Sequence, residues 1–356
     1  MNSTLDPIRV LVADDSAFMR TALSRMIASD PALHVVGTAF DGEDAVAKTL
    51  SLNPDVVTLD IQMPNVDGLE ALRRIRTQCP RPVIIVSSLA QRDADATLTA
   101  LANGAFDCIL KHTEAQSLNI DHLRDLLITT IKAAAESHRR PTTTLAHRKP
   151  VGSVPGAASA TSPAVIAIGT STGGPRALQD ILPQLPADLG IPVLIVQHMP
   201  PGFTNPFAHR LDNLCPLSVR EASHGEEVKE GVVYLAPAGS HMTVQRATDT
   251  RAKIELSSDP KGYLHVPSAD VLMLSVAQEY GTHAMGIILT GMGSDGMEGM
   301  KAIRRKGGFT IGQDEATSAV YGMPRACALA GCLQQVLPLE EIPRQILLTT
   351  HYRKRA

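Results

Sequence analysis

The feature that most constrains the fold is a repeated alternation of short apolar runs with stretches of helical periodicity. The segment 69–79 has apolar residues at i, i+3 and i+4, as in an amphipathic helix, and a second helical stretch covers about 118–135. This alternation predicts a parallel sheet with helices on both faces. The apolar runs of the first half of the chain are 8–14, 34–40, 55–60, 82–88 and 106–111.

The same alternation returns in the second half of the chain. Two segments, 241–246 and 253–258, instead alternate with period two and predict an antiparallel hairpin at the edge of the sheet. The predicted strands of the second sheet are 165–171, 192–198, 231–237, 284–291, 309–314 and 334–339. Helices are expected to follow Pro175, Asn205, Ser268 and Gly296.

Residues 136–163 separate the two halves. This segment contains four prolines and many small polar residues, has no apolar periodicity, and is predicted to be a flexible linker. Two domains also agree with the length of 356 residues, since a domain takes about 150. The predicted boundaries are 8–130 for the first domain and 164–350 for the second.

Composition excludes several classes of protein. The net charge is −3, aromatic residues make up 3% and Trp is absent, so neither a basic nor a base-stacking nucleic-acid surface is expected. No apolar run approaches the ~18 residues of a membrane span, and the first residues lack a secretory signal pattern. The five cysteines are scattered without a CxxC pair, which favours reduced thiols in a cytoplasmic protein.

Acidic residues mark the strand ends of the first domain. Asp14 and Asp15 end the first predicted strand and Asp60 ends the third, while Ser87 and Lys111 end the fourth and fifth. In an open parallel sheet these ends form the ligand site. Converging carboxylates need a cation, and hard oxygen ligands favour Mg²⁺. A single Asp there would be read as a turn or cap residue, but matching positions at four strand ends favour phosphoryl transfer to Asp60.

These residues resemble the receiver domain of two-component response regulators. The segments that carry the resemblance are VLVADDSAFMR (10–20), VVTLDIQMPNVDGLEAL (56–72), VIIVSS (83–88) and CILK (108–111). It implies a five-stranded flavodoxin-like fold, Mg²⁺ held by Asp14 and Asp15, and phosphorylation of Asp60 by a partner histidine kinase. Two positions depart from the receiver pattern: Cys108 stands in place of the switch aromatic, and His112 in place of a proline. Without that aromatic side chain, signalling through a change of its rotamer is in doubt.

The second domain has a G-x-S-x-G turn at 169–173, followed by Pro175. A serine on a strand-to-helix turn exposes its hydroxyl and needs a histidine base oriented by a carboxylate. His198 ends the next predicted strand, and Asp295 follows the strand at 284–291 in a glycine-rich loop. These positions predict a serine hydrolase in which Ser171 is the nucleophile.

Alternatives remain at this level. A glycine-rich strand-to-helix turn can also bind the pyrophosphate of a dinucleotide, although the full G-x-G-x-x-G is absent. Asp314 also ends a strand and competes with Asp295 as the acid. Met292 is either a core residue or a backbone donor to an oxyanion. The order Ser, His, Asp differs from that of the α/β-hydrolases and disfavours that fold.

The second domain is similar to the catalytic domain of CheB-type protein-glutamate methylesterases. The resemblance implies a Rossmann-like fold with Ser171 as nucleophile, His198 as base, Asp295 as orienting acid and oxyanion donors near Thr172 and Met292. Met323 and Pro324 are expected to be structural. The segments that carry it are IGTSTGGP (168–175), IVQHMPPGFT (195–204), YLAPAGSHM (234–242), PSADVLM (267–273), ILTGMGSDG (288–296) and QDEATSAVYGMPRACA (313–328).

The functional expectation is a cytoplasmic, receiver-regulated esterase. The family removes methyl esters from chemoreceptor glutamates, and many members deamidate receptor glutamines. Its unphosphorylated receiver is implied to cover the esterase cleft. Mg²⁺ is expected in the receiver and no cofactor in the esterase reaction. The partners are chemoreceptors and a chemotaxis histidine kinase, with no nucleic acid and no membrane insertion. The alternative is a phosphorylation-switched binding module with a nucleotide-binding second domain.

Overall fold

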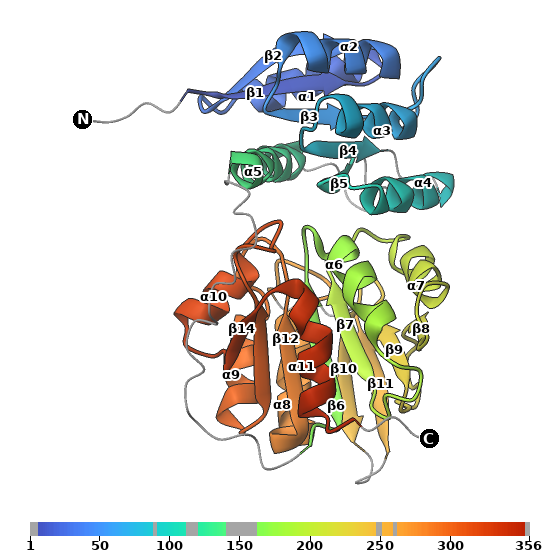
Figure 1. The fold of residues 1–356 in the computed structure, drawn as a ribbon, viewed down its shortest axis with the longest axis vertical. Helices are drawn as coiled ribbons and strands as arrows, with labels where there is room; N and C mark the ends of the chain where they lie inside the picture. The colour runs from blue at the N-terminus through green and yellow to red at the C-terminus, as the bar shows by residue number, and fades with distance from the viewer. Residues whose placement is uncertain are drawn as a thin grey trace, which may run out of the picture. The chain divides into compact units, whose positions relative to one another are not determined.

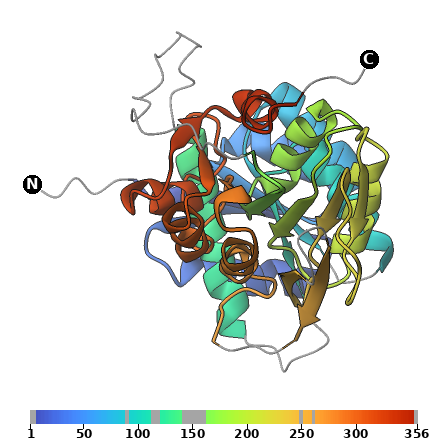
Figure 2. The same cartoon turned by 90° about the horizontal axis from the view of Figure 1, so that it is seen from below.

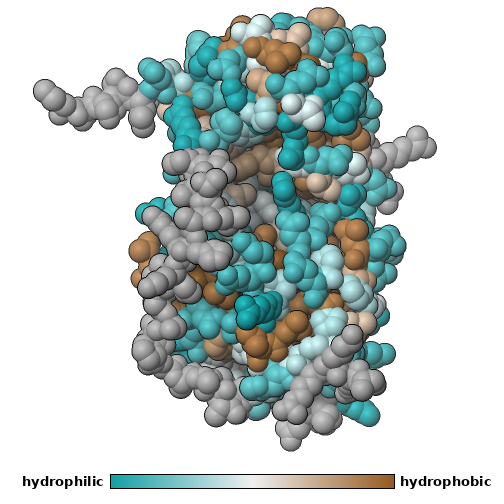
Figure 3. Space-filling view, viewed as in Figure 1, coloured by the Kyte–Doolittle hydropathy of each residue, from teal (hydrophilic) through white to brown (hydrophobic). Residues whose placement is uncertain are grey.

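The computed structural model describes residues 6–87, 91–111, 120–139, 162–246, 251–258 and 262–352. The chain divides into two compact units, Met1–Thr142 and Thr143–Ala356, and each is described here by itself. None of the helices in the described ranges is long and apolar enough to cross a membrane. On the face drawn in Figure 3, hydrophobic residues form separate patches among hydrophilic ones.

The first unit is a five-stranded parallel sheet with the order β2-β1-β3-β4-β5. Its strands are β1 (Ile8–Ala13), β2 (Leu33–Ala39), β3 (Val56–Leu59), β4 (Val83–Ser87) and β5 (Asp107–Leu110). Its helices are α1 (Ala17–Ala28), α2 (Gly42–Leu52), α3 (Gly68–Gln78), α4 (Gln91–Ala102) and α5 (Ile120–Arg139). Helix α1 contacts α5, and α3 contacts both α2 and α4, so the helices form two layers around the sheet (Figure 1).

Local sequence signals explain where the first three helices begin. Ser16, Asp41 and Asp67 each cap a helix by accepting a backbone N–H from three residues further on. Position 68 also requires glycine, because a Cβ there would lie 2.0 Å from the carbonyl oxygen of Asp60. The chain after β3 can therefore pass directly beside Asp60.

The second unit is a seven-stranded parallel sheet with the order β14-β13-β12-β6-β7-β9-β8. Its strands are β6 (Val165–Thr170), β7 (Val193–Gln197), β8 (Ser218–Glu221), β9 (Val232–Leu235), β12 (Ala284–Ile288), β13 (Phe309–Gln313) and β14 (Gln335–Leu337). Its α-helices are α6 (Gly174–Ile181), α7 (Thr204–Asp212), α8 (Ala269–Tyr280), α9 (Met297–Arg305), α10 (Met323–Leu329) and α11 (Ile342–Thr349). Figure 2 shows α8 and α9 on one face of this sheet and α6 and α11 on the other.

The predicted α/β fold with two parallel sheets is confirmed, with some differences in detail. The predicted antiparallel hairpin forms as β10 (His241–Arg246) and β11 (Ala252–Ser257), but it is a separate two-stranded sheet that packs against α8. The edge strands of the main sheet are β14 and β8, and the short polar segment SVRE of β8 has no period-two signal. Helices α10 and α11 were not predicted. Helix α5 continues to Arg139, so residues 136–139 of the predicted linker are helical.

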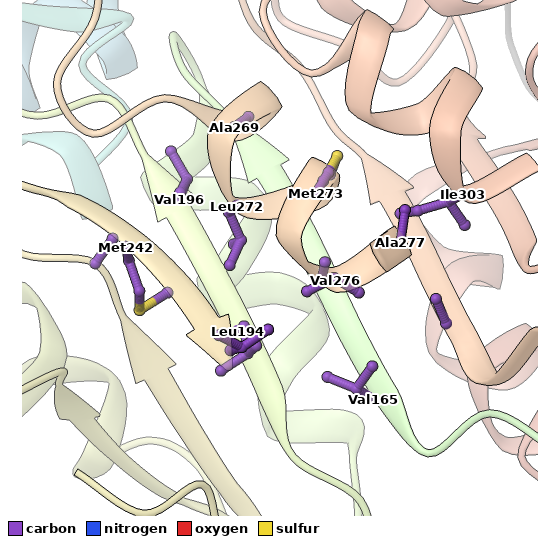
Figure 4. Close-up of a cluster of buried hydrophobic side chains, with 14 of the residues drawn as sticks. Val165, Leu194, Val196, Met242, Ala269, Leu272, Met273, Val276, Ala277 and Ile303 are labelled. Carbon is purple, nitrogen blue, oxygen red and sulfur yellow. The ribbon is translucent and has the colours of Figure 1, made fainter. Parts of the chain in front are cut away.

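Each unit has its own hydrophobic core. In the second unit, β6 and β7 contribute Val165 and Leu194, which pack under Leu272 and Val276 of α8 (Figure 4). In the first unit, Val10 and Ile84 of the sheet pack with residues of α1 and α5. The two clusters share no residue, so the two units are expected to unfold as separate cooperative units.

Single core truncations test this separation. We expect Leu194→Ala to destabilise the second unit by about 2–5 kcal/mol, because it removes a fully buried side chain. Ile84→Ala is expected to do the same to the first unit alone. Scanning calorimetry should resolve two transitions, of which each variant lowers one. If either substitution lowered both transitions equally, the cores would not be independent.

Candidate functional sites

Three carboxylates come together at one edge of the first sheet. Asp14 and Asp15 follow β1 and Asp60 follows β3, and one oxygen of each lies within 4.8 Å of the others. Asp14 and Asp60 are buried, while Asp15 is exposed. Such a set of oxygen donors with one open side fits Mg²⁺, which keeps part of its water shell in proteins.

Lys111 lies against two of these carboxylates. Its Nζ is 2.8 Å from Asp14 Oδ2 and 2.6 Å from Asp60 Oδ2. Burial raises the pKa of Asp60 above its usual range, and the lysine opposes this shift. Burial alone would lower the pKa of Lys111, but hydrogen bonds to the two carboxylates raise it, so the ammonium stays charged. The carbonyl of Ser87, at the end of β4, accepts a hydrogen bond from the Lys111 backbone N–H at 2.8 Å.

The structure therefore brings together all five residues predicted for the acidic site. Of the two positions that depart from the receiver pattern, the structure describes Cys108. Cys108 lies on β5, and burial raises the pKa of its thiol above the usual range. His112 lies outside the described residues, as does Ser88, which follows Ser87.

The serine turn of the second unit is held by backbone hydrogen bonds. The N–H of Ser171 donates to the carbonyl of Thr290 at 3.0 Å, and the Ser171 carbonyl accepts from the N–H of Gly174 at 2.8 Å. Gly173 has φ of +80°, the left-handed region that favours glycine. A Cβ at Gly291 would lie 2.8 Å from Ser171 Cβ, so the backbone before Met292 passes directly against the serine.

His198 is placed beside this turn by the pairing of two strands. Thr170 of β6 pairs with Gln197 of β7, and the N–H of His198 donates to the Thr170 carbonyl at 3.1 Å. Ser171 and His198 thus leave neighbouring strands at the same edge. His198 Nε2 lies 2.8 Å from Asp295 Oδ2, whereas Nδ1 is buried and has no hydrogen-bond partner within the described parts of the chain.

This geometry assigns the two ring nitrogens. A carboxylate accepts only, so Nε2 of the neutral imidazole carries the proton donated to Asp295. Nδ1 is then the basic nitrogen. The ring of His265 stacks on that of His198, with centroids 4.1 Å apart and planes 19° apart, which further fixes the imidazole.

Asp295 lies at the N-terminus of α8. A carboxylate in this position is stabilised by the free N–H groups of the first helical turn. Burial acts to raise the pKa of Asp295, but its hydrogen bonds, led by the one from His198, hold it well below the usual range. Besides His198, its donors are Ser268 Oγ at 2.7 Å and the backbone N–H groups of Ala269 at 2.7 Å, Asp270 at 3.0 Å and Gly296 at 3.1 Å.

The rival acid, Asp314, has a different role in the fold. Its carboxylate accepts from the backbone N–H of Thr317 at 3.0 Å and from the Thr317 hydroxyl at 2.6 Å, which stabilises a turn. Among the described residues, the carboxylate bonded to His198 is that of Asp295. The geometry thus favours Asp295 as the partner of the imidazole.

Sequence reasoning missed several residues that support this site. The side-chain amide of Gln197 donates to the carbonyls of both Ser171, at 2.9 Å, and His198, at 3.0 Å. The Thr290 hydroxyl donates to the carbonyl of Thr172 at 2.9 Å. Gln197 and Thr290 lie within segments quoted for the family resemblance, but nothing in the sequence indicates which carbonyls they bind. The position of His265 against His198 has no sequence signal.

A hydroxyl, an imidazole and a buried carboxylate at the carboxyl ends of parallel strands are typical of serine hydrolases. An acidic cluster with a lysine on a smaller five-stranded sheet is typical of receiver domains. Together they define a receiver domain joined to a hydrolase-like domain, and the comparisons with known proteins agree. The sequence matches the CheB methylesterase family over residues 166–346 and the response regulator receiver domain over residues 10–121.

Relatives match along nearly the whole chain. It is 45% identical to protein-glutamate methylesterase/protein-glutamine glutaminase 2 of Nitratidesulfovibrio vulgaris, over 96% of this chain and 98% of that protein. It is 44% identical to a Pyrococcus horikoshii protein-glutamate methylesterase/protein-glutamine glutaminase, over 96% of this chain and 93% of that protein. The crystal structure of the Thermotoga maritima CheB methylesterase catalytic domain covers 53% of this chain and 99% of that chain, with 39% identity and a TM-score of 0.51.

The chain belongs to the CheB methylesterase family. The predicted class of protein, a methylesterase joined to a response-regulator receiver, is thereby confirmed.

The hydrogen bonds of Asp295 predict how stability depends on pH. Folding lowers the pKa of the Asp295 carboxyl. The carboxylate therefore adds to the free energy of unfolding above the unfolded pKa of about 3.9, and this stabilisation is lost progressively as the pH falls below that value. We expect Asp295→Asn to lower the free energy of unfolding at about pH 5, and the difference from wild type to narrow toward about pH 3. Urea unfolding at both pH values measures this. A difference that is constant or grows on acidification would contradict the prediction.

Proposed function

We propose that Ser171, His198 and Asp295 form the catalytic triad of this protein-glutamate methylesterase and protein-glutamine glutaminase. The observation that carries the proposal is the hydrogen bond from His198 Nε2 to Asp295, which leaves Nδ1 buried and without a hydrogen-bond partner among the described residues, on a histidine whose backbone bonds the residue before Ser171. A base in this state can accept the serine proton without first losing another partner.

The reaction is an acyl transfer in two steps. Ser171 Oγ attacks the γ-carbonyl carbon of the glutamyl methyl ester while His198 Nδ1 takes the hydroxyl proton. The proton then passes to the leaving methoxide, and methanol departs from the acyl-enzyme. A water molecule, deprotonated by His198, attacks the same carbon and releases the glutamate and Ser171. With a glutamine substrate the leaving group is ammonia.

The tetrahedral intermediate carries a negative oxygen that needs hydrogen-bond donors. We assign this role to backbone N–H groups at Thr172 and Met292. Support comes from the close approach of Gly291 to Ser171 and from the position of Thr172 directly after the nucleophile. The peptide that carries the Thr172 N–H is held through its Ser171 carbonyl, which accepts from the Gly174 N–H and from the Gln197 side-chain amide.

In the receiver, Asp60 is the proposed phosphorylation site. Asp14, Asp15 and Asp60 would hold Mg²⁺, which neutralises the charge of an incoming phosphoryl group. Lys111 is already within hydrogen-bond distance of Asp60 and can contact a phosphoryl oxygen there. Ser87 is the proposed hydroxyl contact. The donor is a chemotaxis histidine kinase, and the esterase substrates are chemoreceptors.

The receiver is proposed to inhibit the esterase until Asp60 is phosphorylated. The domain limits 8–130 and 164–350, a linker that begins after α5 and extends to residue 163, and a cytoplasmic location belong to the same proposal. The absence of disulfides among the five cysteines, all of which are free thiols, agrees with a reducing compartment. A nucleotide-binding second domain is the alternative, and membership of a methylesterase family argues against it.

Substitution of the nucleophile tests the triad. Ser171→Ala is expected to reduce methanol release from methylated chemoreceptor membranes by about 10³-fold or more, as for other triad nucleophiles. The fold and the phosphorylation of Asp60 should be unchanged, because the two units have separate cores. Asp314→Asn is the matched control for Asp295→Asn. If Asp314→Asn cost more activity, the assignment of the acid would be wrong.

Regulation is tested on the same receptor preparation. Deleting residues 1–135, or cutting the chain within 136–163, should raise the basal esterase rate of the unphosphorylated protein. A small phosphodonor with Mg²⁺ should activate the full-length protein, and either chelation of Mg²⁺ or Asp60→Asn should prevent this. Equal basal rates for the full-length and truncated proteins would rule out inhibition by the receiver.

A further inference from the structure

We propose that Tyr263 and Leu264 form a contact surface for the substrate protein, at an apolar side chain next to the esterified glutamate. The inference rests on the proposed catalytic role of His198. It concerns a short loop, residues 262–268, which leads into α8 and contributes no member of the triad.

The loop is attached to the active site at both the base and the acid. The His265 ring stacks on that of His198, with centroids 4.1 Å apart, and Ser268 Oγ donates to Asp295 at 2.7 Å. Between these contacts, the carbonyl of Val266 accepts a hydrogen bond from the N–H of Gly239 at 3.1 Å. The loop therefore has a fixed position relative to the catalytic imidazole.

Two large apolar side chains precede this attachment and face solvent. Leu264 is 83% exposed, the highest value among the large hydrophobic residues of the described ranges, and Tyr263 is 41% exposed. The Tyr263 ring packs edge-on against His241, with centroids 5.1 Å apart, and the Nδ1 of His241 accepts from the Ser268 N–H at 3.2 Å. Tyr263 is thus anchored, and Leu264 projects beside it, one residue from the ring that stacks on His198.

The nature of the substrate explains an exposed leucine in this place. The reacting group is the side chain of a glutamate in another protein, and it is short. To bring that ester to Ser171, residues next to the glutamate must approach the rim of the site, which the 262–268 loop helps to form. A leucine there gains from burial only if the facing side chain is apolar, because a charged partner would lose hydration.

The test separates binding of the substrate protein from chemistry. The full-length protein, activated with acetyl phosphate and Mg²⁺, is assayed on methylated chemoreceptor membranes and on N-acetylglutamate γ-methyl ester, which has the same ester without surrounding protein. The variants are Leu264→Ser, the conservative Leu264→Met, and Leu329→Ser as a control. Leu329 is 79% exposed at the C-terminal end of α10.

We expect Leu264→Ser to lower kcat/KM on receptor membranes by roughly three- to tenfold, mainly through KM. A contact remote from the reacting ester stabilises the bound substrate and the transition state equally. The small ester should show less than about a twofold change by the same reasoning. Leu264→Met should keep most of the wild-type kcat/KM on receptor membranes. Leu329→Ser should have the wild-type kcat/KM on both substrates.

Several outcomes would overturn the inference. Equal losses on both substrates would mean that Leu264→Ser disturbs the imidazole through His265. Unchanged kinetics on receptor membranes would mean that the surface does not touch the substrate protein. A raised basal rate on the small ester without phosphodonor would assign Leu264 to a contact with the receiver instead. Failure of wild type to hydrolyse either ester would refute the proposed function itself, which is a distinguishable result.

Discussion

The proposed active site of the second unit depends on the carboxylate of Asp295 at the N-terminus of α8. A buried carboxylate is costly unless its charge is compensated, and here the first turn of a helix and the Ser268 hydroxyl supply the donors. His198 adds its bond to an anion that the fold already stabilises. The Asp295 carboxylate thus connects helix α8, the 289–296 loop and the end of β7. It also sets the orientation of the His198 imidazole.

The two units solve the same electrostatic problem in different ways. In the receiver, the acidic residues lie so close that their repulsion must be offset by the ammonium of Lys111, which contacts Asp14 and Asp60. That arrangement leaves a charged lysine against the carboxylate that is the proposed phosphoryl acceptor. In the esterase, the compensating groups are the imidazole of His198, the Ser268 hydroxyl and backbone N–H groups of the first turn of α8. They hold the pKa of Asp295 well below its usual range, which keeps a carboxylate beside the proposed base.

Most of the chemistry could be predicted from sequence because parallel strands place their carboxyl ends at one edge of a sheet. That rule, applied to the apolar runs together with the G-x-S-x-G turn, predicted that Asp60, Ser171 and His198 lie at strand ends. The rule alone does not separate Asp295 from Asp314, since both follow strands. In the structure, the hydrogen bond from His198 to Asp295 and the turn between Asp314 and Thr317 distinguish them. The edge strand β8 was missed because a short polar strand has no periodic signal. The stacking of His265 on His198 joins residues 67 positions apart in the chain, which no local pattern can indicate.

The relative position of Ser171 and His198, the proposed nucleophile and base, is set by the backbone more than by their own side chains. Strand pairing puts Thr170 beside Gln197, and the Gln197 amide then binds the carbonyls of Ser171 and His198 together. Both carbonyls belong to the peptide units that carry the reacting groups, so neither strand end can shift without breaking a buried hydrogen bond, which is costly. The acid, in contrast, is brought from β12 by a loop and fixed by α8. The site is therefore a rigid pair on adjacent strands, to which a separately anchored carboxylate is added, and substrate contacts can vary in the loops around it.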